Sequence, residues 1–264
     1  MLLVKTDING VEQWNQNFGG TGDDRGMSVR QTNDGGYIVC GGTTSNTAGP
    51  WDSDVYLIKT DINGVEQWQK TFGGTSNDLG SSVKQTTDGG FIICGVTESF
   101  NTLNLNGAYS VYLIKTDGNG NELWNKTFGG TNEERGYSVQ QTTDGGYIIS
   151  GTTLSFANGI ADVYLIKTDG SGNELWNKTF GGTYEDVGVD VQQTTDGGYI
   201  ITGTTSTFGN GNLQLIPNWA RNPTGNPTEN PDGYADNYSD NPNEDGTGNV
   251  STNDGYSSSE NLDF

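Results

Sequence analysis

One phrase occurs four times along this chain, and its repetition constrains the fold more than any other feature. It reads "DGNGNELWNKTFGGT" from Asp117 and "DGSGNELWNKTFGGT" from Asp169, with looser copies from Asp7 and Asp61. Four residue columns keep successive spacings of 54, 56 and 52: Lys5, Lys59, Lys115 and Lys167; Trp14, Trp68, Trp124 and Trp176; Phe18, Phe72, Phe128 and Phe180; Asp34, Asp88, Asp144 and Asp196. Such a period predicts similar units that stack on one another.

Each repeat contains four segments with the composition of β-strands. In the third repeat they read "VYLIKTD", "ELWNKTF", "YSVQQT" and "YIISGTT", with the turn signals "DGNG" and "TDGG" after the first and third. The first is almost entirely apolar, as a strand buried on both faces should be. Four antiparallel strands in about 50 residues are typical of one β-propeller blade. We therefore predict an all-β, propeller-like array of four four-stranded blades over 2–44, 55–97, 111–153 and 163–205, in a repeat domain of 1–216.

The closure of this array is left open by the sequence. Residues 212–216 match the first strand of a fifth repeat, so the blades close into a ring, belong to a longer array, or exchange a strand with another subunit. A parallel β-solenoid is the alternative fold, although its rungs are usually shorter. All length variation falls in the links after the fourth strand, so one end of the blades carries variable loops. We place any binding function at that end.

Composition argues against several functional classes. The formal net charge is −21 and histidine is absent, which argues against nucleic-acid binding, His-based catalysis and most zinc sites. No apolar stretch is long enough to cross a bilayer, so we expect no membrane insertion. No signal peptide is visible, because Met1 leads directly into repeat sequence. Cys40 and Cys94 share a column with Ser150 and Thr202, which indicates a small, tightly packed site in preference to a disulfide.

The repeat consensus, "DVYLIKTDGNGNELWNKTFGGT" followed by "TTDGGYIISGTT", resembles repeats in secreted and surface proteins of bacteria and archaea, related in style to the delta-60 type. The resemblance covers residues 2–216 and implies a location outside the cell with a binding or scaffold role. Asp-x-x-Gly-x-x-x-Trp also recurs, and is similar to the tryptophan-docking motif of quinoprotein dehydrogenase propellers. That similarity implies that Trp14, Trp68, Trp124 and Trp176 pack between blades. The cofactor ligands of those enzymes are not recognisable here.

Residues 217–264 form an acidic tail rich in Asn, Asp, Pro and Gly, which cannot bury enough apolar surface to fold alone. Its stretch "PDGYADNYSDNPNEDGTG" resembles the calcium-binding linkers of thrombospondin type 3 repeats, without their cysteines and with only one unit. The resemblance makes Asp232, Asp236, Asp240 and Asp245 candidate calcium ligands. A plain acidic tail is the alternative.

Further candidate sites follow from columns and links. The carboxylates Asp24, Asp78, Glu134 and Asp186 share one loop position; they could form a cation-binding ring, perform glycosidase chemistry, or cap their loops. The link aromatics Trp51, Phe100, Tyr109 and Phe156 could stack on sugars or a partner protein, or pack back onto the blades. Candidate glycosylation sequons begin at Asn125, Asn177, Asn237 and Asn249.

We expect a non-catalytic extracellular or cell-surface protein, with no cofactor apart from calcium as a candidate. The first hypothesis is a scaffold or filament-like assembly subunit that joins copies of itself, or another surface protein, through its C-terminal strand and tail. The alternative is a lectin-like or adhesive module that binds carbohydrate on the variable loop face. A secreted glycoside hydrolase is the third hypothesis and ranks below the other two. Catalytic carboxylates should differ from the residues at the same position in other repeats, and these carboxylates do not.

Overall fold

The computed structural model describes residues 1–45, 52–100 and 108–207, which are all-β and contain no helix. The all-β prediction is confirmed; the surplus strand at 212–216 and the tail at 217–264 lie outside the described residues. The strands are β1 (Leu2–Thr6), β2 (Glu12–Asn17), β3 (Asp24–Gln31), β4 (Tyr37–Thr43), β5 (Asp54–Thr60), β6 (Glu66–Phe72), β7 (Asp78–Gln85), β8 (Phe91–Thr97), β9 (Ser110–Thr116), β10 (Glu122–Phe128), β11 (Glu134–Gln141), β12 (Tyr147–Thr153), β13 (Asp162–Thr168), β14 (Glu174–Phe180), β15 (Asp186–Gln193) and β16 (Tyr199–Thr205).

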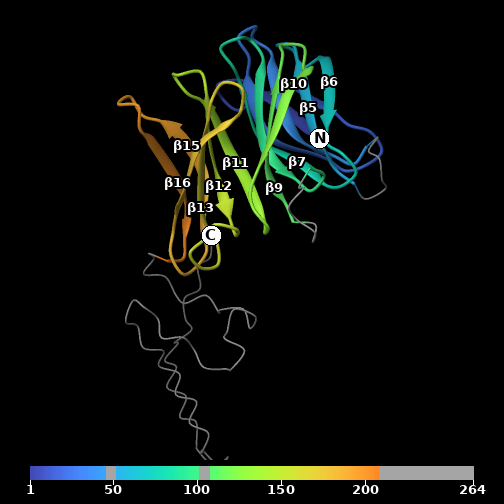
Figure 1. Cartoon of the computed structure of the whole chain (residues 1–264). Helices are drawn as coiled ribbons and strands as arrows, with labels where there is room; N and C mark the ends of the chain where they lie inside the picture. Colours follow the sequence, from blue (N-terminus) through green and yellow to red (C-terminus); the bar gives the residue numbers. More distant parts are fainter. Residues whose placement is uncertain (46–51, 101–107, 208–264) are drawn as a thin grey trace, which may run out of the picture. The chain divides into compact units, whose positions relative to one another are not determined.

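The strands form three complete four-stranded antiparallel sheets, β3–β6, β7–β10 and β11–β14, and two two-stranded sheets, β1–β2 and β15–β16 (Figure 1). The predicted sheet boundaries are therefore displaced by two strands from the observed ones. Each complete sheet takes the last two strands of one repeat and the first two of the next, so the sheets do not coincide with the predicted units 2–44, 55–97, 111–153 and 163–205. Within residues 1–45, 52–100 and 108–207, three sheets are complete where four were expected.

This displacement has a simple cause: a repeat period shows which strands recur but not where a sheet begins. The variable link closes a hairpin, because β4 pairs with β5 in continuous register from Tyr37↔Thr60 to Thr43↔Asp54. The constant "FGGT" loop instead carries the chain from one sheet to the next. The "DxNG" turns are hairpin turns as expected. In the second, Asp61 Oδ1 accepts hydrogen bonds from Asn63 N and Val65 N at 2.8 and 2.9 Å.

Adjacent sheets pack face to face and build the core between them. The first packed junction joins Ile38, Cys40, Val55, Leu57 and Phe72 of sheet β3–β6 to Val83, Phe91, Ile93, Tyr112 and Ile114 of sheet β7–β10. Every residue of β8, β9 and β12 is buried, which confirms that the apolar strands have two covered faces. The strong contacts between sheets join only those that follow each other along the described chain.

The column of small residues is tightly packed in the interior. Cys40, Cys94 and Ser150 are fully buried, and both cysteines are free. Burial raises the pKa of the Cys40 thiol to about 12, so this thiol is an inert packing group. Thr202, in the same column, is exposed because no further sheet of the described residues packs on that face of β16.

Candidate functional site

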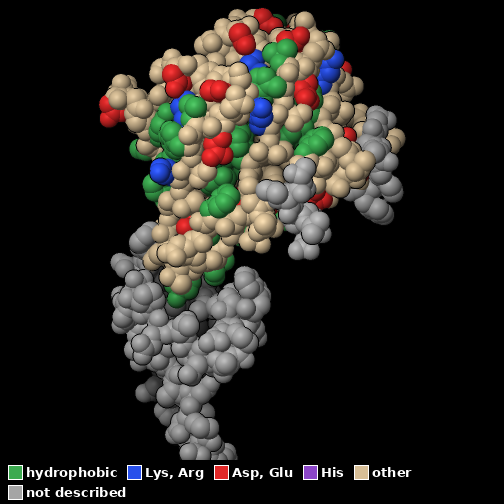
Figure 2. Space-filling model, viewed as in Figure 1, with side chains coloured by type: hydrophobic (Ala, Val, Ile, Leu, Met, Phe, Trp, Pro, Cys, Tyr) green, Lys and Arg blue, Asp and Glu red, His purple; other side chains and the backbone are tan. Residues whose placement is uncertain are grey.

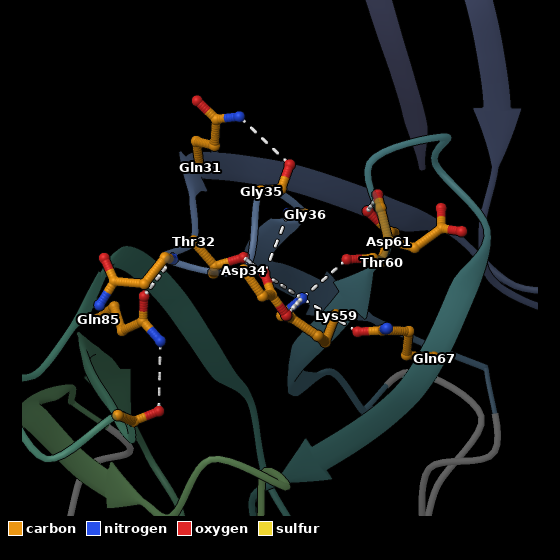
Figure 3. A network of polar contacts seen from close by, with 12 residues as sticks. Gln31, Thr32, Asp34, Gly35, Gly36, Lys59, Thr60, Asp61, Gln67 and Gln85 are labelled. Atoms are coloured by element: carbon orange, nitrogen blue, oxygen red, sulfur yellow. Dashed lines mark hydrogen bonds and ion pairs between the residues drawn. The ribbon is translucent and has the colours of Figure 1, made fainter.

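A buried lysine joins the two hairpins of each complete sheet (Figure 3). Lys59 Nζ on β5 lies 2.8 Å from Asp34 Oδ2 in the β3–β4 turn, and donates to Thr60 O at 2.9 Å and Gln67 Oε1 at 3.0 Å. The hydrogen bonds from Lys59, and next from the Thr32 hydroxyl, lower the pKa of Asp34 to about 2. The lysine side chain is only 5% exposed, so the Asp34 carboxylate and the two neutral acceptors together compensate for its burial.

The same ion pair recurs in the other two complete sheets. Lys115 lies 3.0 Å from Asp88, and Lys167 lies 3.0 Å from Asp144. In each case the aspartate belongs to one repeat and the lysine to the next. These ion pairs, called the turn pairs below, therefore connect consecutive repeats.

One further turn pair is split between the two ends of the described chain. Lys5 Nζ on β1 donates to Thr6 O at 2.6 Å and Gln13 Oε1 at 3.0 Å, and no carboxylate of the described residues pairs with it. Asp196, in the β15–β16 turn, accepts hydrogen bonds from the Thr194 hydroxyl and from Gly198 N, and no described lysine or arginine pairs with it. Lys5 in one end sheet and Asp196 in the other are thus the two halves of a turn pair that each complete sheet contains within itself.

The two end sheets also expose apolar columns that are buried in the interior. On β16, Ile200 is 61% exposed, whereas its counterpart Ile148 on β12 is 0% exposed. On β1, Val4 is 46% exposed and its counterpart Ile58 is 0% exposed. Figure 2 shows hydrophobic side chains at the surface over the β15–β16 end of the described fold. Each end sheet therefore has two strands instead of four, but its side chains are as apolar as those of the buried interior strands.

A hollow of about 350 Å³ lies beside β16, with Val163, Phe180, Asp186, Val187 and Ile201 among its lining residues. Phe180 is 50% exposed there, while Phe128, its counterpart one sheet earlier, is 7% exposed. In the interior this phenylalanine packs in one cluster with a tyrosine from the first strand of the next repeat, as Phe128 does with Tyr164. The hollow is therefore the place where a further first strand would lie.

The repeated tryptophans pack between sheets, as the docking-motif similarity implied. Trp14, Trp68, Trp124 and Trp176 make edge-to-face contacts with Tyr37, Phe91, Tyr147 and Tyr199 at centroid distances of 5.7 to 5.9 Å, and each partner lies in the following sheet. The first three also lie under the glycine of the next sheet's "DxNG"-type turn, where an added Cβ would be within 3 Å of the ring. Gly10, the first glycine of this column, has nothing within 4 Å.

The carboxylate column caps its own loops. Asp78, Glu134 and Asp186 are at most 2% exposed, and Asp24 is half-buried. Each accepts a hydrogen bond from the second glycine N–H of the "FGGT" loop, at 2.9 to 3.1 Å. A hydroxyl from the following link also donates to Asp24, Asp78 and Asp186, as from Ser99 to Asp78 at 2.6 Å. An exposed carboxylate ring is not formed, because these side chains are directed into the protein.

A second carboxylate lies beside Asp78 at the link end. Asp54 Oδ1 and Asp78 Oδ2 both lie within 3 Å of where a Cβ on Gly73 would be. Burial, then the charges of Asp78 and Asp52, raises the pKa of Asp54 to about 6. Asp162 and Asp186 repeat the arrangement around Gly181. No group of three or more acidic or cysteine side chains in the described ranges is arranged to hold a metal ion.

The link aromatics that are described pack back against the sheets. Phe100 and Phe156 contact Tyr112 and Tyr164 at centroid distances of 5.5 and 5.6 Å, and remain 37% and 45% exposed. Arg135 lies over the ring of Tyr109, 5.1 Å from its centroid. They do not converge on a described pocket.

The remaining predicted residues are the sequon asparagines, Trp51 and the tail aspartates. The sequon residues Asn125 and Asn177 are half-buried and donate to Glu122 and Glu174 at 2.7 and 2.6 Å. Trp51, Asn237, Asn249 and the tail residues Asp232, Asp236, Asp240 and Asp245 lie outside the described residues. Sequence reasoning missed the split turn pair. Its signal was present, since an aspartate that pairs with the lysine of the next repeat must leave one of each unpaired.

Comparison with known proteins gives no family. No family model matches the chain, and no curated protein matches it. Among solved structures, it is similar to a protein of unknown function from Bacteroides caccae, with 12% identity and a TM-score of 0.46 over 76% of this chain and 64% of that one. In the described part of the chain, no helix is long and apolar enough to cross a membrane.

Proposed function

We propose that this chain is a non-catalytic scaffold protein outside the cell, and that its stacked sheets are the blades of a propeller-like array that assembles through its open edges. One observation carries the proposal. The two-stranded sheets β1–β2 and β15–β16 correspond to the two halves of the four-stranded sheet that occurs three times between them. A half sheet with an unpaired edge readily accepts another strand.

The composition of these edges supports association. Proteins that remain monomeric usually protect edge strands with charge, proline or a covering loop. β16 has no described strand on its outer edge, and its open face instead carries Ile200, which is 61% exposed. The large negative charge opposes unspecific aggregation, because like-charged copies repel unless a complementary contact holds them.

The non-catalytic part of the proposal rests on the carboxylates. Those of the repeated column are held by loop N–H groups and hydroxyls, as structural caps are, and they repeat with the architecture. The location outside the cell rests on the resemblance of the repeats to those of secreted and surface proteins.

Sedimentation velocity of the full chain over a concentration series tests the proposal. We expect mass above that of one chain, and we expect Ile200→Lys to shift the material to monomer by placing a charge on the open apolar face of β16. Ile62→Lys is the matched control, because Ile62 is similarly exposed, at 59%, but belongs to the β5–β6 turn of a complete sheet. A wild-type chain that stays monomeric at every concentration would contradict the proposal.

A lectin-like or adhesive module is the second candidate. The observation in its favour is that Phe100 and Phe156 are 37% and 45% exposed at the link end, where their rings could stack on a sugar. Glycan-array binding by the monomeric Ile200→Lys chain would move this function to first place.

A further inference from the structure

We infer that the β15–β16 hairpin of one copy pairs with the β1–β2 hairpin of a second copy, so that the two half sheets complete one four-stranded sheet. This inference rests on the proposed function and names its partner. The interior supplies the geometry, because β12 pairs with β13 from Tyr147↔Thr168 through Ile149↔Ile166 to Gly151↔Tyr164. Transferred to the ends, that register places Tyr199 opposite Thr6, Ile201 opposite Val4, and Gly203 opposite Leu2 of the second copy.

Charge complementarity identifies the partner. Each complete sheet buries one lysine against one turn aspartate, at 2.8 to 3.0 Å. The completed sheet would bring Lys5 of the second copy to Asp196 in the same way. Glycine geometry agrees: a Cβ on Gly146 would lie 2.6 Å from Lys167 Nζ, whereas a Cβ on Gly198 would meet only Thr194 and Asp196 of its own turn. Among the described residues, no other group occupies the place that the lysine takes in the interior.

Apolar columns match across the same contact. Interior Ile148 packs with Val191 of the following sheet, and both are at most 3% exposed. At the ends, Ile200 is 61% exposed and Val29, the counterpart of Val191, is 43% exposed. Stacking the completed sheet on β3–β6 of the second copy would bring these two residues together and bury both.

Two aromatic positions match as well. Phe180, at 50% exposure, lacks the first-strand side chain that covers Phe128 in the interior, and Leu2 on β1 occupies that first-strand position and is 62% exposed. Trp176 packs on Tyr199 but has no turn glycine over it among the described residues, while Gly10 has no ring beneath it. Phe180 and Trp176 at one end thus have their counterparts, Leu2 and Gly10, at the other.

The partner is a second copy because the described hairpins lie at opposite ends of the stack. Three complete sheets separate β1–β2 from β15–β16, and the strong contacts of the described strands join only sheets that are consecutive in the chain. Contact between copies is therefore head to tail, and repetition of it gives a ring or a filament of subunits.

Charge exchange between copies tests the inference in the full chain. We expect Lys5→Asp alone, and Asp196→Lys alone, to raise the dissociation constant at least about tenfold, since each places like charges in one contact. An equimolar mixture of the two variants should recover wild-type mass in sedimentation velocity, because alternating copies then join one acidic and one basic side chain at every contact. The double variant, which reverses both charges in one chain, should also recover it. The melting temperatures of both single variants, at monomer concentration, establish that they fold.

The outcomes separate this inference from the proposed function. A wild-type chain that never assembles overturns both. Assembly that Ile200→Lys abolishes, but that neither charge variant weakens, keeps the scaffold and overturns the β1–β2 partner. Closure within one chain would leave wild type and all variants monomeric, with both single variants melting below wild type and the double variant melting at the wild-type temperature. That result would overturn the inference that the partner is a second copy. A disulfide between a Leu3→Cys chain and a Thr202→Cys chain, formed on mixing under oxidising conditions, would fix the register, because these positions correspond to the opposed residues Leu165 and Ser150.

Discussion

Strands β12 and β16 have almost the same sequence and very different surroundings. β12 reads "YIISGTT" and β16 reads "YIITGTT", yet all seven residues of β12 are buried and none of β16 is. The difference cannot come from the strands themselves. β12 lies between β11 and β13 in its sheet and against β15 of the next, whereas β16 pairs only with β15 among the described strands. In this array, the burial of a strand is therefore set by the strands and sheets that surround it and not by its own sequence.

Truncation of one isoleucine in each strand tests this comparison most directly. At a concentration where the chain is monomeric, Ile148→Ala should reduce the free energy of unfolding by about 2–5 kcal/mol, because it leaves a cavity in a filled junction. Ile200→Ala should change it by less than about 0.5 kcal/mol, since its side chain is already in water. Chemical denaturation followed by tryptophan fluorescence measures both.

The same pair of variants has an informative second readout. In assembled material, Ile200→Ala should weaken association although it leaves the monomer unchanged. Equal losses of monomer stability for the two variants would show that the β16 face is covered within one chain, and the contrast with β12 would then be void.

A glycine pair sharpens the comparison on the opposite hairpins. Gly120 and Gly10 occupy the same turn position with φ of +76° and +80°, so alanine is strained at both, at about 1 kcal/mol. At Gly120 the new Cβ would also lie 2.6 Å from Trp68, whereas at Gly10 it would meet nothing within 4 Å. We expect Gly120→Ala to reduce the free energy of unfolding by about 1–2 kcal/mol more than Gly10→Ala.

Thermal unfolding of the two alanine variants gives the comparison. Under assembling conditions the difference in stability between the two variants should become smaller, because Trp176 of another copy would then contact Gly10. An equal loss of stability in the monomer would mean that backbone strain, and not the tryptophan contact, dominates at this turn.

Sequence reasoning recovered local structure and missed the partition of strands into sheets. The turn and strand patterns are local, so "DGNG", "TDGG" and the apolar "VYLIKT" segments identify themselves. Whether Phe72 ends a sheet or continues into Asp78 depends on which strands pair, and a periodic sequence reads the same from any starting strand. The carboxylate column was ambiguous for the same reason. Asp78 resembles a binding residue in sequence, but in the structure it is buried and accepts hydrogen bonds from the Gly74 N–H and the Ser99 hydroxyl.

The two ends of the β3–β6 sheet are also expected to change the stability of the fold in opposite directions as the pH falls. At the turn end the pKa of Asp34 is lowered to about 2, so this group contributes stability above pH 4 that is lost as the pH falls toward 2. At the link end the pKa of Asp54 is raised to about 6 from its ordinary 3.8 by burial and by Asp78. The native state then binds its proton more tightly than the unfolded chain, so stability rises as the pH falls from about 6 to 4. We expect the melting temperature to rise by about 1–3 °C between pH 7 and pH 5 and to fall below pH 4. Asp54→Asn should abolish the rise and retain the fall, and Asp34→Asn should reduce the fall and retain the rise. A rise that persists in Asp54→Asn would assign it to another carboxylate of this junction.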